Sequence, residues 1–173
     1  MSDLSELLGA VYEAMEGSDT SLAYSERHGI ASQAILTVTD DEIADLIAEH
    51  LRPHIEGKIV VEIGGGLGLL SLHMGHIAKR VYCIEANPMW SWMFAQCLLA
   101  AKPKNVSFLF GAADEFVGSI KGDIAIVCSH SGLQPMKLAA SQFAPVVIDF
   151  YGKLIAEAPH LFDPFAREAR NFA

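Results

Sequence analysis

The sequence predicts an α/β domain in which helices cover both faces of a mainly parallel sheet, a doubly wound arrangement. An apolar run at Ile59–Ile63 is typical of a fully buried strand, and glycines and an amphipathic pattern follow it. From this point strand and helix patterns alternate, which favours a parallel sheet with helical crossovers. The hydrophobic share of 51% and the mean hydropathy of +0.30 suit a sheet that is buried on both faces.

Two helical patterns precede the sheet and make up an N-terminal helical segment, residues 1–56. The first pattern spans Leu4–Met15. The second begins at Thr39–Glu42, whose side chains can cap a helix and place acids in its first turn. Pro53 is expected to end or kink this helix. Its apolar stripe consists of Ile43, Leu46, Ile47 and Leu51.

The remaining residues, 57–173, form the α/β core of a single expected domain that spans residues 1–173. Strands are expected at 59–63, 81–85, 105–110, 122–128 and 146–151. Helices are expected at 67–79, 88–101 and 134–142, and residues 157–173 form a tail.

The loop after the first strand carries glycines at 64, 65, 66 and 68. Because glycine has no Cβ, this backbone can turn sharply and approach a ligand closely. Glu62 precedes the loop. Glu85 ends the second strand about 20 residues further on, where dinucleotide folds place the carboxylate that binds ribose hydroxyls. The nicotinamide-type spacing would need a glycine where the chain has Leu69.

The spacing E-x-G-x-G-x-G over residues 62–68 resembles motif I of the class I S-adenosylmethionine-dependent methyltransferases. The resemblance covers Lys58–Ser131, because the ends of four expected strands follow the family's order. It implies a Rossmann-like sheet with strand order 3-2-1-4-5, truncated at its C-terminal end because little chain follows strand five. It also implies S-adenosylmethionine as the cofactor. The residues that it assigns to the cofactor are Glu62, Gly64, Gly65, Gly66, Gly68, Glu85, Ala86, Asn87, Met89, Ala113, Asp114 and Cys128.

One departure from the family concerns the residues after strand three. Family members often carry an acid directly after the glycine there, and this acid contacts the adenine amino group. Here that position is Ala112. The resemblance therefore implies that Asp114 or Glu115 substitutes for the acid.

A second departure concerns Cys128–Ser131, which follows strand four beside the point where open parallel sheets bind ligands. Amino-methylating members carry Asn/Asp-Pro-Pro-aromatic at this place, so methylation of adenine or glutamine amino groups by that motif is not expected. His130 is the candidate catalytic residue, because an imidazole can serve as a general base near neutral pH. A histidine on a surface loop is the alternative interpretation.

The other histidines and the aromatic residues have structural interpretations. His73 with His76, and His50 with His54, have helical spacing but no further ligand types beside them, so no metal site is expected. Three aromatic residues of the second crossover helix cannot all face the sheet. Core packing is the default interpretation of these side chains. The alternative is that one of them lies over the cofactor or at a subunit contact, which is compatible with a homodimer. These residues are Trp90, Trp92 and Phe94.

The net charge and the cysteines of the chain indicate which classes of partner and which cellular compartment to expect. The net charge is −9, with 12 Lys+Arg against 21 Asp+Glu, so a small-molecule or protein acceptor is favoured over nucleic acid. No apolar run approaches a membrane span and the first residues lack a signal-peptide pattern, so no membrane partner is expected. The scattered cysteines, Cys83, Cys97 and Cys128, indicate buried free thiols in a reducing cytoplasm.

The sequence leaves three functions open. The first is methyl transfer from S-adenosylmethionine to an unidentified acceptor. The second is a non-catalytic regulatory or partner subunit that binds S-adenosylmethionine, which the unusual stretch after strand four favours. The third is a nicotinamide-dependent oxidoreductase, against which the glycine spacing counts.

Overall fold

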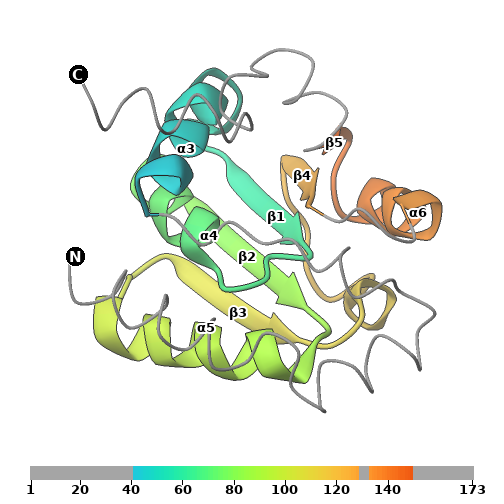
Figure 1. Cartoon of the computed structure of the whole chain (residues 1–173). Coiled ribbons are helices and arrows are strands. Elements are labelled where there is room, and N and C mark those ends of the chain that lie inside the picture. Colours follow the sequence, from blue (N-terminus) through green and yellow to red (C-terminus); the bar gives the residue numbers. More distant parts are fainter. Residues whose placement is uncertain (1–40, 129–132, 150–173) are drawn as a thin grey trace, which may run out of the picture.

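The computed structural model describes residues 41–128 and 133–149. Within them five parallel strands form one sheet in the order β3-β2-β1-β4-β5, as predicted (Figure 1). The chain enters the sheet at β1, moves outward through β2 to β3, and then crosses to the other side of β1 for β4 and β5. This reversal creates a switch point at the carboxyl ends of β1 and β4, where open sheets of this kind bind ligands.

The bounds of the elements lie close to the predicted ones. The strands are β1 (Ile59–Ile63), β2 (Arg80–Glu85), β3 (Val106–Phe110), β4 (Ile124–Val127) and β5 (Val146–Asp149). The helices are α3 (Asp41–Ile55), α4 (Leu69–Met74), α5 (Pro88–Ala101) and α6 (Leu133–Phe143), and η2 (Ala113–Phe116) is a short 3-10 helix. The predicted helix over Leu4–Met15 and the tail at 157–173 lie outside the described residues.

Helix α4 is shorter than predicted, because it stops at Met74 and not near Lys79. The side-chain amide of Asn105 donates hydrogen bonds to the carbonyl oxygens of Gly75 (2.8 Å) and Ala78 (3.0 Å). These long-range bonds satisfy carbonyl groups that a continuing helix would use, so the chain leaves the helix in a series of turns. The apolar spacing alone could not reveal this.

Helix α3 continues through Pro53 and ends at Ile55. Gly57 follows with a φ of 67°, a left-handed conformation that commonly terminates helices. Of the two expected effects of Pro53, an end or a kink, the end is wrong by two residues, and Gly57 follows the actual end of the helix.

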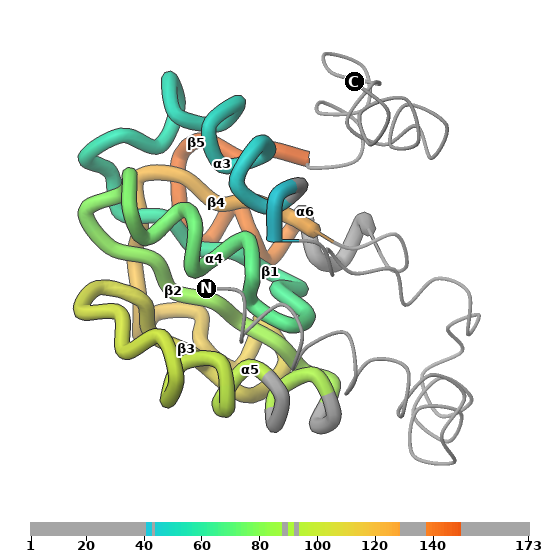
Figure 2. The backbone as a smooth tube through the Cα atoms, turned by 60° about the vertical axis from the view of Figure 1, so that its left-hand side comes forward, coloured from blue at the N-terminus to red at the C-terminus, as the bar shows by residue number. Residues whose placement is uncertain are grey.

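Helices α3, α4 and α5 cover one face of the sheet, and α6 with η2 covers the other (Figures 1 and 2). Side chains along β1 alternate between these faces, as in any strand. Val60 packs in the core beneath α3 and α4, whereas Val61 packs in the core beneath α6. The same alternation turns Glu62 toward α4.

The aromatic residues of α5 lie mainly in the core. Trp90 and Phe94 are buried between α4, α5 and β2, where Phe94 also contacts Phe108 edge-on. The side chain of Trp92 lies outside the described part. Core packing therefore accounts for two of the three aromatic residues, Trp90 and Phe94.

The cysteines of the described residues are free thiols, as predicted. Cys83 and Cys97 are buried and Cys128 is half-buried. Burial raises the pKa of the Cys97 thiol to about 11, which keeps it protonated and unreactive near neutral pH. In the part of the chain that the structure covers, no helix has the length and apolar character needed to cross a membrane.

Candidate functional site

The glycine loop joins β1 to α4 at the carboxyl edge of the sheet. Gly64, Gly66 and Gly68 adopt left-handed conformations, with φ of 78°, 57° and 76°. The amides of Gly64 and Gly65 donate to the carbonyl of Ile84 in β2, at 2.9 Å and 3.2 Å. The loop is therefore fastened over the ends of the two central strands.

Two of these glycines are needed for internal packing. A Cβ added at Gly65 would overlap the Sγ of Cys83, and one added at Gly68 would overlap the ring of Phe94. Close approach of the loop to β2 and α5 therefore explains the glycine at both positions. A ligand is not required to explain them.

Glu85 ends β2 directly beside this loop and is buried, with 8% of its surface exposed. Its Oε2 accepts a hydrogen bond from the amide of Gly66 (2.8 Å), and its Oε1 accepts one from the amide of Asn87 (2.7 Å). Burial raises the pKa of this carboxyl, while the amides of Asn87, Gly66 and Ala86 partly oppose the rise. A carboxylate can accept about four hydrogen bonds, so Glu85 keeps acceptor capacity for a ligand that donates hydroxyl groups.

Glu62 lies at the centre of a buried polar group that we call the Glu62 cluster, which comprises Glu62, Ser71, Cys83 and Cys128. The hydroxyl of Ser71 donates to Oε2 of Glu62, and the thiol of Cys128 donates to Oε1 at 3.5 Å. Burial raises the pKa of the Glu62 carboxyl to about 7, although the donors Ser71, Cys128 and Cys83 favour its ionised form. This carboxyl can therefore change its charge near neutral pH.

The residues after β3 wrap the same edge of the sheet. The amide of Gly111 donates to the carbonyl of Glu85 at 3.1 Å, which joins the two strand ends. Asp114 and Glu115 lie exposed on η2, and Ala113 packs partly into the core beneath α6. The Glu115 carboxylate lies against Gly111, so close that a Cβ on Gly111 would overlap it. Of the two acids, Glu115 is the one whose contact with the end of β3 is established.

The end of β4 meets the end of β1. The amide of Cys128 donates to the carbonyl of Ile63 at 2.9 Å, and its thiol reaches Glu62. Burial and the neighbouring Glu62 hold the pKa of the Cys128 thiol well above its usual range, so it is not a nucleophile. Ser129–Ser131 lie outside the described residues, so His130 stays a prediction. Met89 lies in the first turn of α5, and its side chain is also outside the described part.

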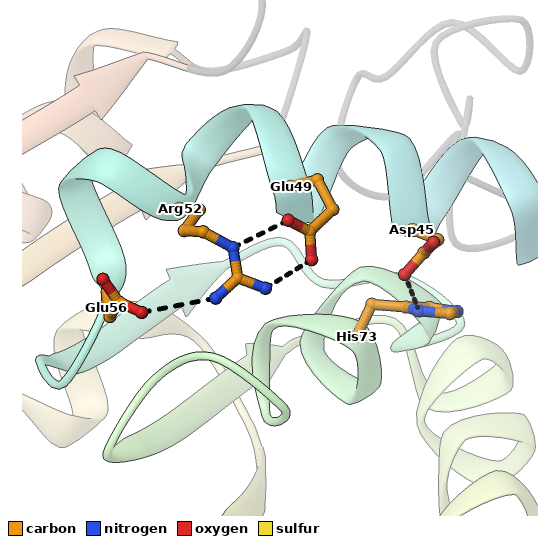
Figure 3. Close-up of polar contacts among 5 residues, drawn as sticks. All are labelled: Asp45, Glu49, Arg52, Glu56 and His73. Carbon is orange, nitrogen blue, oxygen red and sulfur yellow. Dashed lines mark hydrogen bonds and ion pairs between the residues drawn. The ribbon is translucent and has the colours of Figure 1, made fainter.

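His73 has a structural role. Its ring nitrogens contact the carboxylates of Asp41 (2.7 Å) and Asp45 (3.1 Å), which ties α4 to α3 (Figure 3 draws the Asp45 contact). Because the carboxylates bind opposite edges of the ring, the three side chains do not converge on one point. Among the residues that the structure describes, no group of three His, Cys, Asp or Glu side chains could hold a metal ion.

The structure thus brings together most of the residues that the sequence singled out. The glycine loop, Glu62, Glu85, Ala86, Asn87 and Cys128 meet at the ends of β1, β2 and β4. Sequence reasoning missed Ser71 and Cys83 as partners of Glu62. Cys83 lies opposite Glu62 in the parallel register of β1 and β2, and Ser71 lies in the first turn of the helix after the loop. Both relations could be derived only once the strand register and the loop geometry were known.

A parallel sheet of order 3-2-1-4-5 with a glycine loop after β1 and an acid at the end of β2 is the fold of the class I S-adenosylmethionine-dependent methyltransferases, and this chain has that fold. No protein-family model matches the sequence.

Individual relatives are distant. A probable histone-arginine methyltransferase CARM1 of Oryza sativa subsp. indica is 34% identical over 79 residues, which are 43% of this chain and 15% of the plant protein. A precorrin-6y C5,15-methyltransferase of Geobacter metallireducens superposes with a TM-score of 0.54 at 19% identity, over 62% of this chain and 59% of its own. A methyltransferase of Thiobacillus denitrificans in complex with S-adenosyl-L-homocysteine has a TM-score of 0.50 at 20% identity, over 60% of this chain and 44% of its own. The chain therefore corresponds to only part of each relative.

Proposed function

We propose that the chain binds S-adenosylmethionine at the glycine loop and transfers its methyl group to an acceptor that is yet to be identified. The observation that carries this proposal is Glu85, a buried carboxylate at the end of β2 that is bonded to the amide of Gly66 in the loop. The neighbour of the same fold that holds S-adenosyl-L-homocysteine supports the choice of ligand.

Glu85 is proposed to bind the ribose of the cofactor. The amides of Gly66 and Asn87 occupy one acceptor position on each of its oxygens. The remaining capacity suits the two hydroxyl groups of a vicinal diol, which both donate. Because the same carboxylate holds the loop, ribose binding and loop position are expected to depend on each other.

Glu115 is proposed to meet the adenine amino group in place of the acid that is missing at Ala112. Its carboxylate folds back against Gly111, directly after the strand that pairs with β2. Asp114, on the same 3-10 helix, remains the alternative.

The cofactor supplies a methyl group that is already activated on a sulfonium centre. The protein's task is then to align the acceptor with the methyl group and to exclude water. Cys128 leads into the stretch where the acceptor is proposed to enter, and His130 is the residue proposed to position or deprotonate it.

The net charge of −9 favours a small molecule or a protein as the acceptor over nucleic acid. Free thiols at Cys83, Cys97 and Cys128 fit a reducing compartment, so we propose a cytoplasmic protein. A homodimer is compatible with this proposal.

Calorimetric titration with S-adenosylmethionine tests the proposed site. Wild-type protein should bind saturably, and Glu85→Ala should weaken binding by about 1–3 kcal/mol, since a charged acceptor is lost. Glu85→Gln keeps one acceptor oxygen but sets its NH2 group against the amide of Gly66 or Asn87, so it should also weaken binding. Circular dichroism and urea unfolding check that both variants fold. Equal affinity in wild type and a folded Glu85→Ala variant would remove the ribose assignment.

A second candidate is a non-catalytic subunit that binds the same cofactor. The stretch Cys128–Ser131 favours it, because it lacks the Asn/Asp-Pro-Pro-aromatic element of amino-methylating members. The enzyme and the non-catalytic subunit can be distinguished by incubating the protein with S-adenosylmethionine and mixtures of possible acceptors, and measuring the release of S-adenosylhomocysteine. Binding without release in any mixture would favour the subunit, whereas release that depends on His130 would support the enzyme.

A further inference from the structure

The Glu62 cluster is a buried site for a proton directly beneath the glycine loop. Glu62 has 1% of its surface exposed, and Ser71 and Cys83 are fully buried. The Glu62 carboxylate lies beside the loop, since a Cβ added at Gly65 would be in van der Waals contact with its Oε2, at 3.4 Å. A change of charge on Glu62 therefore changes the electrostatic potential at the loop.

Among the residues that the structure describes, the charged and titratable groups around this cluster are acids and thiols. β2 contributes Cys83 and Glu85, the end of β4 contributes Cys128, and β5 contributes Asp149, which acts on Cys128. α4 contributes the hydroxyl of Ser71, while its His73 turns away to Asp41 and Asp45 of α3. In the described part of the chain, neither Glu62 nor Glu85 forms an ion pair with a Lys, Arg or His side chain.

Two neighbouring buried carboxylates destabilise each other's ionised forms. Burial is the main cause that raises the pKa of Glu62 to about 7, and the charge of Glu85 adds to it. A positive charge that enters the loop would reverse this effect, because it favours the ionised carboxylate. The loop therefore suits a cationic ligand, and its cation would expel the proton.

We propose that binding of a cationic ligand at the glycine loop is coupled to the release of a proton from Glu62. This inference rests on the proposed function, in which the ligand is S-adenosylmethionine with its positively charged sulfonium. S-adenosylhomocysteine lacks that charge. The protein then prefers the methyl donor over the demethylated product increasingly as the pH rises through neutrality.

Proton release can be measured by calorimetry in buffers of different ionisation enthalpy, at about pH 6, 7 and 8. Because the pKa of Glu62 is about 7, wild-type protein should release up to about one proton per S-adenosylmethionine at pH 6, about half a proton at pH 7 and little at pH 8. Its affinity should therefore rise by up to about tenfold per pH unit below neutrality and level off above it. S-adenosylhomocysteine should cause a smaller release. The ratio of the two affinities should therefore increase with pH.

Three variants separate Glu62 from other sources of the proton. Glu62→Gln keeps the shape of the side chain but cannot titrate, so the proton release and the pH dependence should be lost. Ser71→Ala removes a donor to the carboxylate and should move the release window to higher pH. Glu56→Gln changes an exposed acid at the end of α3 and should behave as wild type.

The outcomes that overturn the inference differ from those that overturn the proposed function. Binding of S-adenosylmethionine without proton release, or full release in Glu62→Gln, would overturn the inference alone. If Glu62→Gln does not fold, an unshifted release window in Ser71→Ala would overturn it. A wild-type protein that binds neither ligand would overturn the proposed function, and the inference with it.

Discussion

At the scale of single residues, the glycines of the loop serve two different purposes, close packing and hydrogen bonding, which the sequence does not distinguish. Gly65 and Gly68 are required by Cys83 and Phe94, against which the loop packs. Gly66 instead presents its amide to Glu85. Some glycines of the motif are therefore explained by packing and another by a polar contact, and the structure is needed to tell which is which.

We predict that Gly68→Ala destabilises the protein more than Gly57→Ala. Both glycines are left-handed, with φ of 76° and 67°, so alanine should cost about 1–2 kcal/mol at either position. At Gly68 the added methyl group also overlaps the Phe94 ring, which should cost about 1–3 kcal/mol more. No atom lies within 4 Å of the corresponding methyl at Gly57, which makes it the matched control. Urea unfolding measures both, and equal losses would contradict the predicted overlap.

At the scale of elements, the sequence predicted the five strands because a parallel sheet buried on both faces leaves continuous apolar runs. β1 and α5 begin and end where expected, since Ile59–Ile63 lies between Lys58 and the glycine loop and Pro88 suits the first turn of a helix. The length of α4 could not be predicted, because a side chain of the distant residue Asn105 ends it. Local sequence patterns determine which helices and strands form, but contacts with residues distant in the sequence determine where some of them end.

The same reasoning applies to the candidate site. The acids and glycines could be identified from their spacing around strand ends. The raised pKa of Glu62 could not, because it depends on how deeply the folded sheet and helix bury this carboxyl, and on the donors Ser71 and Cys83 that partly oppose the rise. The residues of α3 that hold His73 were likewise beyond sequence reasoning.

The contact between α3 and α4 gives an element-scale prediction. Asp41→Ala should destabilise the protein by about 1–2 kcal/mol, because Asp41 accepts a 2.7 Å bond from the buried His73. Asp45→Ala should cost less than about 0.5 kcal/mol, because that side chain is 61% exposed and its contact is longer. In a His73→Ala background the difference should shrink, as a double-mutant cycle in urea would show. A difference that survives unchanged would mean that Asp41 acts without His73.

At the scale of the whole molecule, the fold places two carboxylates in its interior close to one edge of the sheet. Both have a raised pKa because burial disfavours their charge. Such groups lower stability at neutral pH, and carboxyls with a raised pKa are typical of functional sites. The ends of β1 and β2, where both carboxylates lie, are the position at which sheets of this topology bind ligands.

The pH dependence of stability should reveal Glu62. Its pKa is about 7 in the folded protein and near 4.5 when unfolded, so the folded state binds the extra proton between these values. Stability should therefore fall as the pH rises through this window, by up to about 1.4 kcal/mol per pH unit from this group. Glu62→Gln should flatten the fall, so its stability relative to wild type improves from about pH 5 to pH 8. A constant difference in urea unfolding at all pH values would show that Glu62 is already ionised.

The central claim is that the glycine loop and Glu85 form a site for an adenosyl cofactor, and a crystal structure with S-adenosylhomocysteine tests it most directly. The predicted result is density for the ligand across the carboxyl ends of β1 and β2, with the ribose hydroxyl groups within hydrogen-bonding distance of the Glu85 carboxylate. Its adenine amino group should face Glu115. A ligand bound elsewhere, or a ribose held by other residues while Glu85 keeps only the amides of Gly66 and Asn87, would contradict the account.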